Sequence, residues 1–141
     1  MRVPLSLAVL LAFSAFPAAA DELARLQGTW KVVSLEKDGK KRSEDEIKGL
    51  KVIFKEDKFI IKEGDKEFEA VLKLDVGAKP KAIDLMVKQG DQSQTLKGIY
   101  HLDGDDLKIC AAGAPGGDRP TEFATKPKAG VGLVVLKRES P

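Results

Sequence analysis

Apolar side chains recur at every second position along most of the chain. The clearest case is residues 66–75, where Phe68, Ala70, Leu72 and Leu74 alternate with mostly charged residues. Such alternation places the apolar side chains on one face of an extended strand, so it predicts strands that are buried on one side. The same pattern predicts inward positions at Leu50, Val52 and Phe54; Phe59 and Ile61; Ile83, Leu85 and Val87; Leu96, Tyr100 and Leu102; and Leu107, Ile109 and Ala111. With strands at residues 29–33 and 133–137, eight strands are expected.

Short polar segments rich in turn-forming residues separate these strands. They lie at residues 56–57, 63–65, 77–80, 90–91 and 103–105. Connections this short join antiparallel neighbours. Eight such strands hide their apolar faces by closing on themselves or by stacking as two sheets, and stacking usually needs long crossovers. We therefore predict an all-β fold, an eight-stranded antiparallel up-and-down barrel, in which only residues 113–121 have room for a crossover.

Two short helices are expected beside the barrel. Ser43 is followed three residues later by Glu46, a capping box that predicts a short helix between the first and second strands. Residues 22–27 are expected to form a helical turn before the first strand, with Leu23 and Leu26 against one end of the barrel.

Residues 1–20 have the features of a secretory signal peptide. Arg2 precedes an apolar run at residues 5–13 and small residues at 18–20, the order found in exported proteins. We expect cleavage after Ala20, export to the periplasm or the cell exterior, and one domain over residues 21–141. The apolar run is shorter than the ~20 residues of a membrane span, so no span is expected.

Charged residues of both signs are interleaved along the chain. The formal net charge is +2, and it becomes +1 when Arg2 is removed. Nucleic-acid binding requires a basic stripe with stacking aromatic residues, which this sequence lacks. A nucleic-acid partner is therefore not expected.

Few side chains offer catalytic or metal-binding chemistry. The single cysteine, Cys110, has no partner for an internal disulfide, and we expect it to be buried. The single histidine, His101, alternates out of phase with Tyr100 and should face outward. A nucleophile and base pair would require Cys110 and His101 to be cross-strand neighbours. Residues 103–106 have the composition of a tight turn rather than the ligand spacing of a calcium loop. We expect no enzyme activity, no cofactor and no metal.

The expected interior combines large and small side chains. An eight-stranded barrel is at the size where side chains either fill the interior or leave room for one small ligand. The large inward residues Trp30, Phe54, Phe68 and Tyr100 are our candidate ligand contacts, with the Tyr100 hydroxyl as a polar anchor. Small residues at Ala70, Gly98 and Ala111 either open a pocket or complete a filled core.

A second candidate region is the segment after the glycine-rich and proline-rich residues 113–117. Arg119 and Glu122 lie in the stretch Arg-Pro-Thr-Glu-Phe at residues 119–123. They either contact a ligand at the barrel mouth, or pair with each other or with loop backbone and fix the loop in place.

Some apolar residues fall on the expected outer face. They are Val33, Leu35, Ile53, Ile60, Ile99 and, less clearly, Val134. We expect the short helix near Ile47 to cover them; the alternative is an interface with a partner or a second copy. The protein is expected to be a monomer.

Residues near the two ends of the mature chain carry a family resemblance. Gly28, Thr29 and Trp30 form the Gly-x-Trp signature of lipocalins, where a basic side chain from the last strand covers the tryptophan. Arg138 is the best candidate for that role here, with Lys137 second, because a guanidinium stacks well on an indole. Stretches at residues 26–34, 79–85, 98–100, 102–105, 107–110, 119–123 and 136–138 resemble an uncharacterised lipocalin-like domain family abundant in planctomycete bacteria. The resemblance covers almost all of residues 21–141 and implies a small exported barrel.

Two functions of different classes follow. The leading hypothesis is an exported lipocalin-like protein that binds a small apolar or amphipathic ligand in its lumen or at its mouth. The alternative is a cell-envelope module whose barrel is filled and whose loops or outer face bind a protein.

Overall fold

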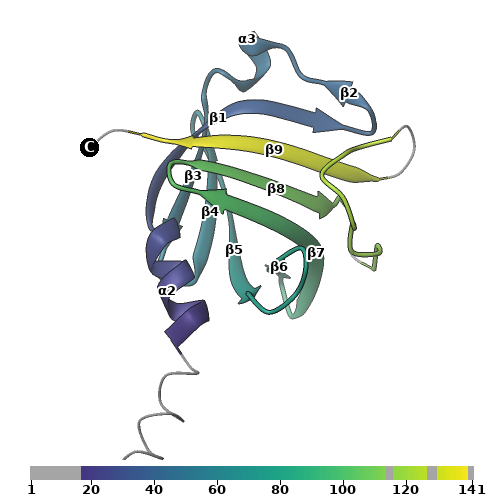
Figure 1. Ribbon diagram of the computed structural model, residues 1–141. Helices are drawn as coiled ribbons and strands as arrows, with labels where there is room; N and C mark the ends of the chain where they lie inside the picture. Colours follow the sequence, from purple (N-terminus) through teal and green to yellow (C-terminus); the bar gives the residue numbers. More distant parts are fainter. Residues whose placement is uncertain (1–16, 114–115, 127–129, 140–141) are drawn as a thin grey trace, which may run out of the picture.

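The computed structural model describes residues 17–113, 116–126 and 130–139 (Figure 1). The first sixteen residues of the predicted signal peptide lie outside the described residues. The elements are α2 (Pro17–Leu26), β1 (Gly28–Lys37), β2 (Lys40–Lys41), α3 (Glu44–Ile47), β3 (Leu50–Lys55), β4 (Lys58–Glu63), β5 (Lys66–Asp75), β6 (Ala82–Gln89), β7 (Gln92–Asp103), β8 (Asp106–Ala112) and β9 (Val131–Arg138). No helix in these ranges combines the length and the apolar composition needed to cross a bilayer.

The strands form a closed antiparallel barrel. Their order is β1-β3-β4-β5-β6-β7-β8-β9, and β9 also pairs with β1. The two-residue strand β2 adds a hairpin to the end of β1. β8 pairs directly with β9, so the long connection between them makes no crossover. The predicted eight-stranded up-and-down barrel, with a short helix between its first two strands, is confirmed.

Local sequence signals explain where the elements begin and end. Gly64 and Gly104 have positive φ angles of 61° and 60° at two of the expected hairpin turns, a conformation that glycine adopts without steric cost. At α3 the hydroxyl of Ser43 accepts a hydrogen bond from the Glu46 backbone N–H, and the Glu46 carboxylate accepts one from the Ser43 N–H. The expected capping box therefore forms.

Aromatic residues fill one half of the barrel. Trp30, Phe54 and Tyr100 are no more than 2 % exposed. The rings of Trp30 and Phe54 meet edge to face with centroids 6.4 Å apart, and Phe54 meets Phe59 in the same way at 5.5 Å. Large rings that interdigitate in this way leave little space between them.

Helix α2 closes the barrel at this same end, which we call the closed end (Figure 1). Leu26 is 1 % exposed, and its carbonyl accepts a hydrogen bond from Trp30 Nε1 at 2.8 Å. The Gln27 side chain binds both backbone groups of Glu56 in the β3–β4 turn. The expected helix before the first strand is present and packs on the barrel through Leu23 and Leu26.

Arg138 lies over the tryptophan, as the sequence pattern favoured. Its guanidinium carbon is 4.3 Å from the Trp30 ring centroid. The same group donates hydrogen bonds to the carbonyls of Arg25 and Gln27 and to the Asp105 carboxylate. Arg138 therefore connects the last strand to α2 and to the β7–β8 turn.

Two of the residues assigned to the outer face instead face inward. The pairing of β1 with β9 shifts register between Val32 and Ser34, so Val33 is an extra residue in β1. This bulge reverses the alternation and turns Leu35 into the barrel. Val134 also faces inward. Because β9 carries apolar residues on both faces, its sequence does not show which face is inward. In the structure, Val134 lies on the same face as the buried Leu136, two positions further along.

The cover over Ile99 is also different from the one expected. Ile99 is on the outer face and is 1 % exposed, and its register partners are Ala82 and Cys110. The segment before β9 binds the strands there, since Ala124 O accepts from Cys110 Sγ. Helix α3 does not cover this face, because its buried residue, Ile47, lines the barrel opening. The prediction that α3 covers the outer face is wrong for Ile99.

Candidate functional site

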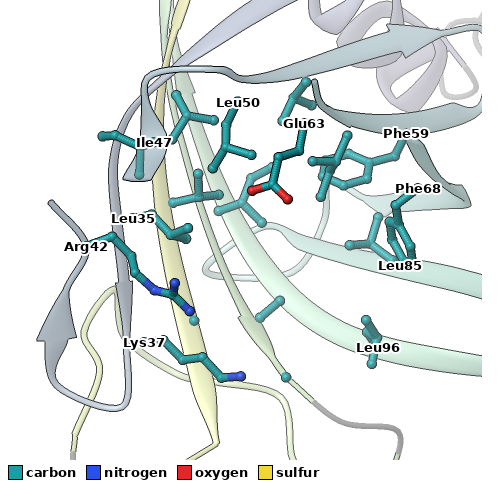
Figure 2. Close-up of a pocket in the computed structure, with 18 of the residues that line it drawn as sticks. Leu35, Lys37, Arg42, Ile47, Leu50, Phe59, Glu63, Phe68, Leu85 and Leu96 are labelled. Atoms are coloured by element: carbon teal, nitrogen blue, oxygen red, sulfur yellow. The ribbon is translucent and has the colours of Figure 1, made fainter. Parts of the chain in front are cut away.

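The end of the barrel opposite α2 contains a cavity of about 590 Å³. We call this the open end. Its walls are mostly apolar, and Figure 2 shows Leu35, Ile47, Leu50, Phe59, Leu85 and Leu96 around the space. A volume of this size falls within the range of small-molecule sites, about 300–1,000 Å³. The lumen is therefore not filled by the protein's own side chains.

The size of the lining side chains explains why the space exists. Three neighbouring wall positions carry small residues: Ala111 near the end of β8, Gly113 just after β8, and Gly132 on β9. Their small side chains leave this half of the barrel open, whereas rings occupy the other half. Gly98 has a different role from that of Ala111. A Cβ at Gly98 would lie 2.9 Å from the Ala111 Cβ and from the Cys110 carbonyl oxygen, so the absence of a side chain allows β7 and β8 to approach.

Charged side chains surround the apolar space at the opening. Lys37, Arg42 and Glu63 all extend into it in Figure 2. Arg42 forms an ion pair with Glu46 at 3.2 Å, and the hydrogen bonds from Ser43 and Arg42 lower the pKa of the Glu46 carboxyl. The cavity thus combines an apolar interior with a charged rim.

The candidate ligand contacts of the sequence divide between the two ends of the barrel. Phe68 lines the cavity and is 39 % exposed. Trp30, Phe54 and Tyr100 do not line it; they are part of the aromatic packing at the closed end. Of these four residues, only Phe68 is positioned to contact a molecule in the lumen.

The Tyr100 hydroxyl is bound within the protein. It donates a hydrogen bond to the Glu22 carboxylate at 3.2 Å, and the Lys81 ammonium lies 2.7 Å from the same oxygen. Burial, and then the nearby Glu22 charge, raise the pKa of Tyr100. Its hydroxyl therefore holds α2 on the barrel rather than anchoring a ligand.

Arg119 and Glu122 do not pair with each other. Arg119 donates to the carbonyls of Gly98 and Ile83, and its Nη2 is 2.8 Å from Asp84 Oδ1. That Asp84 oxygen accepts no hydrogen bond from the described residues, so the contact is one of charge rather than a bidentate bond. Glu122 is exposed and lies 4.0 Å from the Lys126 ammonium. Arg119 thus fixes the loop to the barrel wall.

Replacing Arg119 by glutamine should loosen this loop. The change removes a charge contact and two hydrogen bonds to carbonyls, which predicts a loss of about 2 kcal/mol in the free energy of unfolding. The buried Cys110 lies under the same segment, and its reaction with a thiol reagent should become about tenfold faster. Glu122→Gln is the control and should change both measurements little. Equal effects of the two variants would contradict this role of Arg119.

Beside this loop is a smaller cavity of about 460 Å³, lined by residues that include Lys73, Asp75 and Arg119. Of the charged groups there, Arg119 pairs with Asp84, and Asp75 accepts a hydrogen bond from the Gly77 N–H in the β5–β6 connection.

The two residues considered for covalent chemistry are not paired across the strands. His101 is opposite Lys108, and Cys110 is opposite Ile99. Cys110 is fully buried as expected, and burial raises the pKa of its thiol. His101 is exposed on the outside of the barrel. Within the described ranges, His, Cys, Asp and Glu side chains do not gather in a group of three or more that would hold a metal.

Lys37 and Glu63 are cavity residues that the sequence reasoning missed. Glu63 follows Phe59 and Ile61 in phase, so its inward direction was available from the alternation of β4. Lys37 faces inward only because of the bulge at Val33, which leaves no clear sign in the sequence.

Comparisons of the chain with protein-family models, with curated proteins and with solved structures find no match. The function of this site is therefore inferred from its own residues and their geometry.

Proposed function

We propose that this chain is an exported lipocalin-like binding protein that holds a small apolar or amphipathic molecule in the open half of its barrel. The observation that carries the proposal is the apolar cavity of about 590 Å³, with one end opening to solvent and the other blocked by α2 and the aromatic core. A small molecule can enter such a cavity through the open end and be held against the packed end. The alternative of a barrel filled by its own side chains has no comparable support.

Binding rather than catalysis is part of the proposal. The side chains that reach the cavity are aliphatic, aromatic, or charged groups at its rim, and neither Cys110 nor His101 is among them. The nucleophile and base considered from the sequence therefore lie outside the cavity. A monomer is sufficient for this function, since one barrel encloses the whole site.

Export is proposed on the sequence features, and the position of α2 supports it. Its contacts with the barrel come from Glu22 and later residues, whereas Ala19, Ala20 and Asp21 are exposed. Cleavage after Ala20 would therefore keep these contacts. The stacking of Arg138 on Trp30 supports membership of the lipocalin-like family that the sequence resembles.

Displacement of the neutral dye N-phenylnaphthylamine by a series of straight-chain alcohols tests the container. Each added methylene that enters the cavity should contribute about 0.8 kcal/mol, or about a fourfold gain in affinity. The gain should stop once the chain exceeds the length of the cavity. Failure of every alcohol to displace the dye, or an affinity that ignores chain length, would contradict the proposed function.

A further inference from the structure

The charges at the open end are distributed unevenly between its two sides. One side is formed by the end of β1 and the residues around β2, and it brings Lys37 and Arg42 to the cavity (Figure 2). The opposite side is formed by the β4–β5 hairpin and brings Glu63, Lys66 and Glu67. The balance of charge within each side indicates what the opening would attract.

The β4–β5 side is balanced. Glu63 and Lys66 are direct register partners across the hairpin, and opposite charges at paired positions stabilise each other. Glu67, the third charged residue on this side, is paired with Lys62, whose Nζ lies 3.9 Å from its carboxylate. This side therefore presents little net charge to a ligand.

The β1–β2 side has an excess of positive charge. The register partners of Lys37 are Gly132 on β9 and Lys40 on β2, so neither offers it an acid. Lys37 forms no ion pair with any residue in the described ranges, whereas Arg42 is neutralised by Glu46.

The acids next to Lys37 in sequence are engaged elsewhere. Glu36 accepts a hydrogen bond from the Thr125 hydroxyl at 2.5 Å, and Asp38 accepts one from the Gly130 N–H at 2.7 Å. Both therefore bind the segment before β9. Lys37 is left at the rim with its stem over Gly113, where a Cβ would be 4.0 Å from its Cε.

From this distribution we infer that the ligand is a single-chain amphiphile with an anionic head, which binds Lys37 while its chain lies in the apolar lumen. The inference rests on the proposed function and specifies its ligand class. A carboxylate beside Lys37 gains a charge-assisted hydrogen bond from its ammonium group. An uncharged hydroxyl head at the same position gains less interaction energy from Lys37, and an ammonium head is repelled by it.

Three probes that share one chain length test the head group: decanoate, decanol and decylammonium, measured by displacement of the neutral dye. At pH 8 the carboxylate is ionised and the amine is protonated, given ordinary pKa values of about 4 and 10. Decanoate should bind about tenfold more tightly than decanol, and decylammonium should bind most weakly.

Variants of two lysines identify the group responsible. Lys37→Gln should lower the affinity for decanoate about tenfold and leave that for decanol unchanged. Lys40→Gln removes the same charge from the neighbouring strand, at a residue outside the cavity lining. It should leave decanoate binding within about twofold, because a charge that does not contact the head group acts on it only through solvent, which screens it. Both residues are exposed, and equal melting temperatures confirm folding.

The outcomes separate this inference from the function on which it rests. Equal binding of decanoate and decanol, or tightest binding of decylammonium, would overturn the anionic head and leave the container intact. An equal loss in both lysine variants would overturn the role of Lys37. If none of the three probes displaces the dye, the proposed function fails as well.

Discussion

Replacing Val134 by tryptophan should abolish the binding of alkyl chains and leave the barrel folded. Val134 lines the cavity from β9, and an indole in that position would occupy the space that a chain needs. Because the space is open, the larger side chain does not force the packed core apart. We expect at least a hundredfold loss of affinity in the dye-displacement assay, with a free energy of unfolding within about 1 kcal/mol of the native value.

Val71→Trp is the matched control for this variant. Val71 is half-buried on the outer face of β5, between Lys58 and Met86 in register. The same chemical change there leaves the lumen untouched and should alter affinity by no more than about twofold. Binding by the Val134 variant at native strength would mean that the chain is held outside the lumen.

Replacing Trp30 by alanine should cause the largest loss of stability, about 3–5 kcal/mol in the free energy of unfolding. The indole is fully buried, packs edge to face on Phe54 and lies under Arg138. Its removal also leaves the buried Leu26 carbonyl without its hydrogen-bond donor. Denaturation with urea, followed by circular dichroism, measures the effect.

Phe68→Ala is the control at the other end of the barrel. Phe68 faces inward but is 39 % exposed at the opening, so its truncation should cost no more than about 1 kcal/mol. It should, however, weaken the binding of alkyl chains, because the ring lines the cavity. Comparable losses of stability in the two variants would contradict the division into a packed closed end and an open lumen.

The fold could be predicted because its determinants are local. Each hairpin turn and each alternating strand has its own pattern in the sequence, and the antiparallel neighbours follow from the short connections. The capping box at Ser43 and the pairing of Arg138 with Trp30 also depend on few residues. Features that depend on long-range contacts were harder to predict, such as the loop that covers Ile99.

The site could be predicted only in part, because alternation gives the face of a side chain but not its height along the barrel. Trp30 and Phe68 both face inward, yet one is packed beneath α2 and the other lies at the opening. Reasoning from side-chain size therefore placed Trp30, Phe54 and Tyr100 with Phe68. The bulge at Val33 concealed Lys37 and Leu35, since one extra residue exchanges the two faces of a strand.

Methyl NMR of the protein with decanol shows whether an alkyl chain binds inside the open half of the barrel. We expect contacts between the methylene protons of the ligand and the methyl groups of Leu35, Leu85, Leu96 and Val134. We expect little change at Leu107 and Leu136, which are fully buried outside the cavity lining. Contacts confined to Ile53 and Ile60 on the outer face, or an absence of contacts at saturating decanol, would contradict binding inside the barrel.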